Sequence, residues 1–448
     1  MPMPGSSEAA DAPPSPTLGE LSRVFGRIGL LSFGGPAGQI GMLHRVVVEE
    51  RHWLSEERFL HALNYCMLLP GPEAQQLATY IGWLMHGVRG GIIAGLLFVL
   101  PGLAVIIGLS SAYALYQDTT WLAGLFFGLK AAVLAIVVEA VIRLGRKTLK
   151  SRFLVAVAAL AFVALFVFSL PFPWVVLLAA LTGIFHTRSR GSQTQFEAAP
   201  ADLEKKPPVL GSALTLLFWI CVWQAPIAVL WIASGPQSLM AMFTFFSKMA
   251  LVTFGGAYAV LAYVAQVAVE DYAWLKPGEM LDGLALAETT PGPLVLVLSF
   301  IGFLVGFREA AGLGPLAGGV VGAVLVAWAT FVPSFIWIFA GAPFIERLRG
   351  NRVFSSALSA ITAAVVGVIL NLSIWFSLHV LFRDVRQVAI WPALGLDLSW
   401  PIWGSLDPLA VLLFLLSAIL LFRMRVGMIT VLGVCAVTGL ALRWAGLA

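Results

Sequence analysis

Charged residues are scarce in this 448-residue sequence, in which Asp, Glu, Lys and Arg together make up 11%. A soluble domain typically carries about 25% charged residues. Hydrophobic residues make up 60% of the chain, so much of the apolar surface must face lipid rather than a soluble core. The composition therefore excludes an ordinary soluble protein and predicts an all-α, polytopic membrane protein.

Motifs for several kinds of chemistry are also missing. The three cysteines, Cys66, Cys221 and Cys435, lie far apart in apolar segments, and the six histidines have no ligand spacing, so we expect neither a disulfide framework nor a metal site. The sequence has no G-x4-G-K-[ST], G-x-S-x-G or H-E-x-x-H motif. We expect no ATP motor of that type, no enzyme, no catalytic residue and no cofactor. The net charge of +4 comes mostly from loop Lys and Arg, which indicates topology and not a nucleic-acid partner.

What the sequence does contain is a stretch that occurs twice. Phe33 recurs as Phe254 and Pro70 as Pro291, with an offset of 221 in both cases. The first copy reads Ser32-Phe33-Gly34-Gly35-Pro36 and then Leu69-Pro70-Gly71-Pro72, and the second reads Thr253-Phe254-Gly255-Gly256 and then Thr290-Pro291-Gly292-Pro293. Matches at residues this distinctive indicate a duplicated unit.

The duplication defines the predicted organisation. We expect a disordered cytosolic tail over 1–17, an N-terminal repeat over 18–186, a cytoplasmic linker over 187–208 and a C-terminal repeat over 209–448. The second repeat proper covers about 238–377 and is followed by extra C-terminal helices. A membrane-spanning helix needs about 20 apolar residues. The apolar segments then predict about 10–13 transmembrane segments, the lower number applying if some of them are re-entrant hairpins.

Basic residues predict the orientation of the two repeats. Arg143, Arg146, Lys147, Lys150 and Arg152 follow the fourth predicted span, at about 121–143, whereas Arg347, Arg349 and Arg352 precede the equivalent helix of the second copy, which begins near Ser355. Because Lys and Arg are retained in cytoplasmic loops, the two copies must have opposite orientations. We predict an inverted-topology repeat with the N-terminus inside and the C-terminus outside. Arg383 and Arg386, in a loop predicted to be external, argue against this orientation.

The repeated motifs interrupt the apolar segments where lipid offers no hydrogen bonds. Freed backbone groups survive at membrane depth only when they are buried in protein or line a cavity. Broken helices at matching positions of two halves indicate a transporter's binding site. Plain kinking is the alternative, since Gly and Pro are common in membrane helices.

A helix that restarts after Pro72 or Pro293 presents free N–H groups and the positive end of its dipole, which suit an anion. We therefore predict an anion site without a full set of buried charges. The predicted binding residues are Gly34, Gly35, Gln39, Pro70, Gly71, Pro72, Gln75, Gln76, Thr253, Gly255, Gly256, Thr290, Pro291, Gly292 and Pro293.

Ionisable residues within apolar segments are costly and are candidates for function. Those candidates are Arg27, Glu73, Lys130, Lys248 and Glu288. Glu73 either couples anion movement to protons or caps its helix. Arg27 and Lys248 either attract the anion or extend to the membrane surface. Lys130 and Glu139 are nine residues apart and are not neighbours on one helix face.

These motifs resemble the chromate transporter family, in its long-chain, two-domain form. The resemblance rests on Phe33-Gly34-Gly35-Pro36 and Leu69-Pro70-Gly71-Pro72-Glu73-Ala74-Gln75-Gln76-Leu77 in the first half. In the second half it rests on Phe254-Gly255-Gly256-Ala257-Tyr258, Asp282-Gly283-Leu284 and Thr290-Pro291-Gly292-Pro293-Leu294. It covers about residues 25–376.

The resemblance implies a multi-pass protein of the bacterial inner membrane that exports chromate, driven by the proton motive force or by anion exchange. The expected partners are a chromate- or sulfate-type oxyanion and the lipid bilayer, and a homodimer is an open alternative. A sulfate or other oxyanion permease and a passive anion channel remain alternative functions. An enzyme that reduces chromate is a further class, but the sequence carries no redox cofactor motif.

Overall fold

The computed structural model describes residues 16–33, 35–117, 119–189, 209–232, 235–254, 257–309, 312, 314–341, 352–391 and 396–447. Most of the predicted tail and linker, residues 1–15 and 190–208, lie outside these ranges. The helices of the N-terminal half are α1 (Leu18–Leu31), α2 (Gly35–His44), α3 (Glu56–Cys66), α4 (Glu73–Tyr116), α5 (Thr120–Thr148), α6 (Arg152–Phe166) and α7 (Phe172–Ser189).

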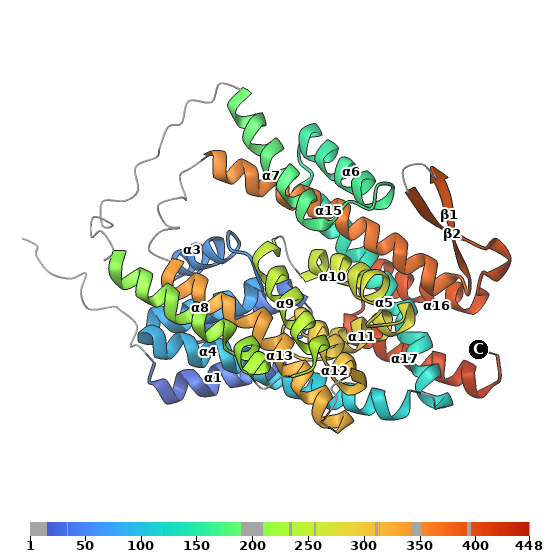
Figure 1. Cartoon of the computed structure of the whole chain (residues 1–448), viewed down its shortest axis with the longest axis horizontal. Coiled ribbons are helices and arrows are strands. Elements are labelled where there is room, and N and C mark those ends of the chain that lie inside the picture. The colour runs from blue at the N-terminus through green and yellow to red at the C-terminus, as the bar shows by residue number, and fades with distance from the viewer. Residues whose placement is uncertain are drawn as a thin grey trace, which may run out of the picture.

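The C-terminal half contains the corresponding helices and further ones. They are α8 (Val209–Ile232), α9 (Gln237–Val252), α10 (Ala257–Gln266), α11 (Pro277–Thr289), α12 (Val297–Glu309), α13 (Pro315–Ile336), α15 (Arg352–Leu381), α16 (Pro408–Ala418) and α17 (Met428–Trp444). A small antiparallel sheet of β1 (Val385–Trp391) and β2 (Leu396–Pro401) lies at the right of Figure 1, near the C-terminus. The described chain is thus almost entirely helical, as the composition predicts.

Within the described ranges, five helices are long and apolar enough to cross a membrane. They are Glu73–Tyr116, Thr120–Thr148, Gly211–Ile232, Pro315–Gly341 and Val353–Leu381. Five shorter apolar helices accompany them: Arg152–Phe166, Phe172–Arg188, Gln237–Val252, Pro408–Arg423 and Met428–Trp444. The shorter five fall below the length of about 20 residues that a full crossing needs.

The segments around the Pro-Gly-Pro motifs fold back on themselves as hairpins. Pro70-Gly71-Pro72, the N-terminal tip, joins α3 to α4, and the rings of Tyr65 and Tyr80 on either side of it stack with centroids 4.9 Å apart. Residues 291–293, the C-terminal tip, join α11 to α12 through the short 3-10 turn η4 (Leu294–Leu296). A Cβ added to Gly283 before this tip would collide with the ring of Phe300 after it.

The segments around the Phe-Gly-Gly motifs are hairpins as well. Glu20, in the first turn of α1, lies 3.1 Å from Arg51, which follows α2 and its π-helical extension η1 (Arg45–Glu50). On α9 and α10, the rings of Phe245 and Tyr263 have centroids 5.9 Å apart. The apolar segments over 18–48, 59–85, 238–268 and 280–306 are therefore hairpins rather than straight crossings, which is the re-entrant alternative of the sequence analysis.

The tips of the hairpins lie inside the molecule, and their other ends lie at opposite faces for the two halves. The first face carries Glu20, and His86 of α4 contacts the carbonyl oxygen of Pro16 there at 2.5 Å. Helix α4 then bends at Gly87 (φ 58°) and runs to Tyr113, which contacts Asp282 near the start of α11 at the second face. The two halves thus form an inverted repeat whose tips meet in the middle, with α1 and α3 at the left of Figure 1.

Candidate functional site

The tips of the two halves exchange backbone hydrogen bonds. The amide nitrogen of Gly71 donates to the carbonyl oxygen of Thr253 at 2.8 Å, and the amide nitrogen of Gly292 donates to the carbonyl oxygen of Ser32 at 2.8 Å. Gly71 and Gly292 are equivalent in the repeat, and so are Ser32 and Thr253. Each Pro-Gly-Pro tip is therefore held by the break in the Phe-Gly-Gly hairpin of the other half.

Glycine is required at both tips because of the backbone conformation there. Gly71 has φ +123° and Gly292 has φ +92°, a region that other residues rarely adopt. Gly35, which begins α2, has φ +68°. Proline on either side of each tip glycine cannot donate a backbone hydrogen bond, so the tips neither continue a helix nor join a sheet.

A cavity of about 20 Å³ lies where three helix starts meet. It is lined by Pro36 and Gln39 of α2, by Gly71, Pro72, Glu73 and Ala74 at the start of α4, and by Pro293, Leu294 and Val295 at the start of η4. A neighbouring cavity of about 10 Å³ is lined by Thr253, at the end of α9, and by Val260 of α10. Spaces of this size hold about one water molecule. We call the larger space the tip cavity.

Buried side-chain amides contact both tips. Nε2 of Gln39 donates to the carbonyl oxygen of Gly292 at 2.5 Å, and Nε2 of Gln76 donates to that of Pro70 at 2.7 Å. The side-chain oxygens of Gln75 and Gln76 and the hydroxyls of Ser32 and Ser334 are buried without a hydrogen-bond partner in the described part of the chain. Unpartnered buried polar groups are costly, so these four atoms are candidates for contact with a ligand or water.

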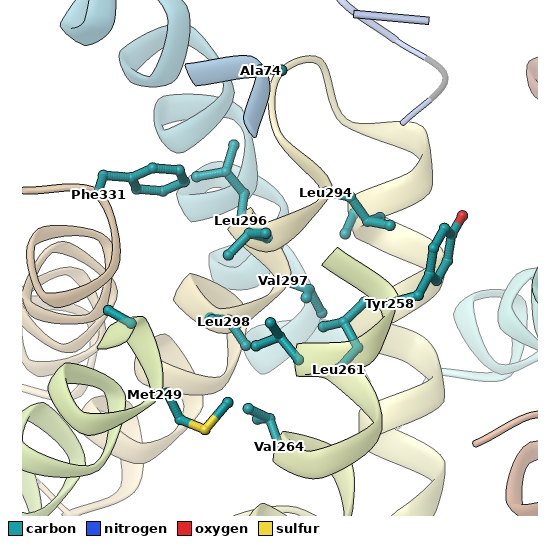
Figure 2. Packing of buried hydrophobic residues seen from close by; sticks show 14 of the residues in the cluster. Ala74, Met249, Tyr258, Leu261, Val264, Leu294, Leu296, Val297, Leu298 and Phe331 are labelled. Atoms are coloured by element: carbon teal, nitrogen blue, oxygen red, sulfur yellow. The ribbon is translucent and has the colours of Figure 1, made fainter. Parts of the chain in front are cut away.

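The C-terminal tip is apolar at the equivalent positions. Leu294, Leu296 and Val297 stand where the first half has Glu73, Gln75 and Gln76. Figure 2 shows these three residues among the apolar side chains of neighbouring helices. The backbone of the repeat is therefore nearly symmetric. The side chains at the N-terminal tip are polar, whereas those at the equivalent positions of the C-terminal tip are apolar.

The long helix of each half packs against the tip of the other half. Gly102, which follows Pro101 in α4, lies so close to the carbonyl oxygen of Pro291 that an added Cβ would collide with it. Ser334, which follows Pro333 in α13, places its hydroxyl 3.6 Å from where a Cβ on Gly71 would be. These contacts bring α4 and α13 to the tip cavity.

The predicted charged residues fall into two groups. Glu73 lines the tip cavity, and no hydrogen bond or ion pair joins its side chain to another described residue. Glu288 is buried and accepts a hydrogen bond from the hydroxyl of Tyr258 at 2.8 Å. Arg27 and Lys248 are exposed and do not line the tip cavity, although Lys248 lines a separate cavity of about 460 Å³.

Lys130 and Glu139 have separate partners. Lys130 lies 3.1 Å from Asp282, whereas Glu139 pairs with Arg143 on its own helix at 3.5 Å. Sequence reasoning overlooked Asp282 as a charged candidate. Its position inside a predicted apolar segment was the available signal.

Of the remaining predicted binding residues, two are already hydrogen-bonded within their helices and three lie outside the described ranges. The hydroxyl groups of Thr253 and Thr290 donate to carbonyl oxygens of their own helices, at Met249 and Leu286, both at 2.6 Å. They are therefore not free donors in this structure. Gly34, Gly255 and Gly256 lie outside the described residues. Ser334 was not predicted, because nothing near it in sequence connects it with Gly71.

No group of three His, Cys, Asp or Glu side chains that could hold a metal ion occurs within the described ranges. The groups that meet at the tips are helix starts, amides, hydroxyls and one carboxylate. Such a set can hold an anion by backbone N–H groups and neutral donors.

Comparisons with known proteins point to one family. A family model described as "Chromate transporter" matches residues 19–184 and 240–440. The chain is 33% identical to the chromate transport protein of Pseudomonas aeruginosa over 374 residues, which is 81% of this chain and 83% of that protein. It is 30% identical to a probable chromate transport protein of Synechococcus elongatus over 80% of this chain and 84% of the relative.

A relative of lower identity is similar over a comparable length. An uncharacterised transporter of Methanocaldococcus jannaschii is 24% identical over 82% of this chain and 86% of its own length. No solved structure matches the chain.

Proposed function

Because this chain belongs to the chromate transporter family, we propose that it exports chromate from the cytoplasm as a secondary active transporter. The driving force in this proposal is the proton motive force or exchange for another anion. The location that suits this role is a bacterial inner membrane, which the chain crosses several times.

The observation that carries the proposal is the exchange of hydrogen bonds between the tips, Gly71 to Thr253 and Gly292 to Ser32. It holds helix starts from both halves around one cavity in the middle of an inverted repeat. Transporters of that architecture bind substrate at the repeat interface, with the N-terminal ends of broken helices directed at anionic groups.

The donors around the tip cavity suit a tetrahedral oxyanion. Backbone N–H groups and the hydroxyls of Ser32 and Ser334 supply neutral donors, so a doubly charged ion is held without a matching set of buried cations. Such donors recognise shape and negative charge rather than the central atom. Sulfate, which has the same tetrahedral shape, should therefore compete with chromate.

The size of the tip cavity favours a carrier over an open channel. At about 20 Å³ it holds about one water molecule and cannot accept a five-atom oxyanion. Binding then requires the tips to separate. A carrier opens its site toward one face at a time, which agrees with hairpins that open to opposite faces.

Basic residues at the end of α5 and the start of α6 suggest how the protein is oriented in the membrane. Helix α5 begins near the second face, just after the end of α4, so the basic residues at its other end lie toward the first face and support a cytoplasmic location for that face; they are Arg143, Arg146, Lys147, Lys150 and Arg152. A membrane potential that is negative inside then favours export, because moving two charges through 100 mV releases about 4.6 kcal/mol. That free energy corresponds to a concentration ratio of roughly three orders of magnitude.

Glu73 is the group best placed to couple protons to the anion. A capping carboxylate would accept hydrogen bonds from its own first turn, and Glu73 makes none in the described part of the chain. Its charge also opposes an anion in the same cavity. We therefore infer that Glu73 exchanges a proton during the transport cycle and so links anion movement to protons.

Chromate uptake into inside-out membrane vesicles tests the proposal. Energised vesicles should take up chromate, an uncoupler should abolish the uptake, and excess sulfate should inhibit it. Uptake that ignores the uncoupler would contradict coupling to the proton motive force and would leave anion exchange or a passive channel. Large single-channel currents in a voltage-clamped bilayer would instead identify a passive anion channel.

A further inference from the structure

A second group of polar side chains joins the two halves away from the tips. Asp282 of α11 accepts a hydrogen bond from the hydroxyl of Tyr113 on α4, at 2.9 Å from its Oδ2. Its Oδ1 lies 3.1 Å from the Nζ of Lys130 on α5. The Asp282 side chain is 9% exposed and that of Lys130 is 26% exposed. A carboxylate from the C-terminal half is thus held by an ammonium and a hydroxyl from the N-terminal half.

This cluster lies between the tip cavity and the second face. Asp282 precedes Pro291 by nine residues, about 14 Å at the rise of an α-helix. Tyr113 follows Gly102, which packs against Pro291, by eleven residues, or about 17 Å. Helices α11 and α4 therefore both place the cluster about 14–17 Å from the tip cavity, toward the second face. In the proposed export, the anion leaves at this face.

The groups that hold Asp282 are the groups that an oxyanion needs. An ammonium and a hydroxyl both donate hydrogen bonds to negatively charged oxygen, and the carboxylate of Asp282 is itself such an ion. We propose that Lys130 and Tyr113 form a second anion-binding site, the exit site, and that Asp282 is a tethered carboxylate that occupies it when no anion is present. This inference rests on the proposed function, because the ligand of the exit site is the transported oxyanion.

A second buried ion pair on the same helix shows a different arrangement. Glu279 lies 2.5 Å from Arg308 and also accepts a hydrogen bond from the backbone nitrogen of Lys276 at 2.9 Å. Arg308 in turn donates to the carbonyl oxygen of Trp274 at 3.2 Å. All of these residues belong to the C-terminal half and fix the start of α11. The Asp282 pair joins different halves, so it can separate when the halves move.

Chromate transport by three variants in proteoliposomes tests the exit site. Asp282→Asn removes the competing charge and should lower the chromate concentration for half-maximal transport at least threefold. Lys130→Arg keeps the cation and should stay within twofold of the unmodified protein. The double variant Lys130→Gln/Asp282→Asn removes the pair without leaving an unpaired charge, so it should fold. It should raise the half-maximal concentration at least tenfold.

Binding is measured separately as the chromate-induced rise in Tm of the detergent-purified protein. That rise should be retained in Lys130→Arg and should shift to higher chromate concentration in the double variant. Glu279→Gln is the matched control, because it breaks the other ion pair of α11. It should lower Tm without chromate and leave the half-maximal concentration unchanged.

The outcomes separate the two proposals. A double variant that transports with unchanged half-maximal concentration would show that the pair is only structural, and would overturn the exit site while leaving the proposed function intact. An unmodified protein that neither binds nor transports chromate or sulfate would overturn both.

Discussion

Gln39 and Gly292 lie 253 residues apart in the chain, and the side-chain amide of Gln39 donates a hydrogen bond of 2.5 Å to the carbonyl oxygen of Gly292. Both groups are at the tip cavity, where Gln39 comes from α2 and Gly292 from the opposite half. The interaction has no counterpart in the repeat, since the position equivalent to Gln39 is Val260. It is one of the features that make the symmetric backbone chemically asymmetric.

Replacing Gln39 by Ala should therefore weaken the contact between the halves. The Gly292 carbonyl would lose its partner in a buried site, which costs about 1–3 kcal/mol. We expect a lower Tm in detergent and at least a fivefold loss of chromate transport. Gln237→Ala, at an exposed position at the start of α9, should change neither quantity. An unaltered Tm in Gln39→Ala would contradict the role of this hydrogen bond.

Gly71→Ala should impair transport more than it impairs folding. Alanine at φ +123° is strained by about 1–3 kcal/mol, and its Cβ would lie 2.7 Å from Nε2 of Gln76. The tip would shift, and its helix start would no longer be directed at the cavity. Transport should fall at least tenfold while most of the protein still purifies in folded form.

Gly108→Ala is the control for that change, because Gly108 lies within α4 with open space around it and an ordinary φ. Gly292→Ala should behave like Gly71→Ala, since Gly292 has φ +92° at the equivalent position. Normal transport in both tip variants would rule out a site built from the tip backbone.

Ser334→Ala separates binding from stability. The Ser334 hydroxyl is buried without a partner among the described residues, so its removal should change the free energy of unfolding by less than about 0.5 kcal/mol. If the hydroxyl donates to the anion, the chromate concentration for half-maximal transport should rise about fivefold to tenfold. Ser373→Ala removes a buried hydroxyl that is bonded to Ile369 in α15, and it should leave that concentration unchanged.

Glu73→Gln should alter proton coupling more than it alters chromate binding. Glutamine keeps the shape of the side chain in the tip cavity but cannot carry a proton between the two faces. Chromate exchange across vesicles without a gradient should persist, whereas chromate-dependent proton movement should fall at least tenfold. Glu57→Gln, at an exposed position, is the control. Equal loss of exchange and proton movement would indicate a structural role for Glu73.

Local sequence was sufficient to predict the breaks in the helices and the class of fold. Proline lacks a backbone N–H, and glycine adopts positive φ at little cost, so Pro70-Gly71-Pro72 and its repeat can be identified as interruptions without any tertiary information. The scarcity of charge predicts lipid contact, and the basic loops predict opposite orientations of the two halves. These properties depend on the residues themselves or on their immediate neighbours.

Only the tertiary structure decided which groups meet. Lys130 pairs with Asp282 rather than Glu139, Ser334 lies beside Gly71, and Gly102 packs against Pro291, and each of these pairs is separated by more than 150 residues. Local patterns do not specify such contacts, because they depend on how whole helices pack. The repeat alone would suggest two equal tips, whereas packing joins the polar residues of one tip to the apolar residues of the other in a single asymmetric cavity.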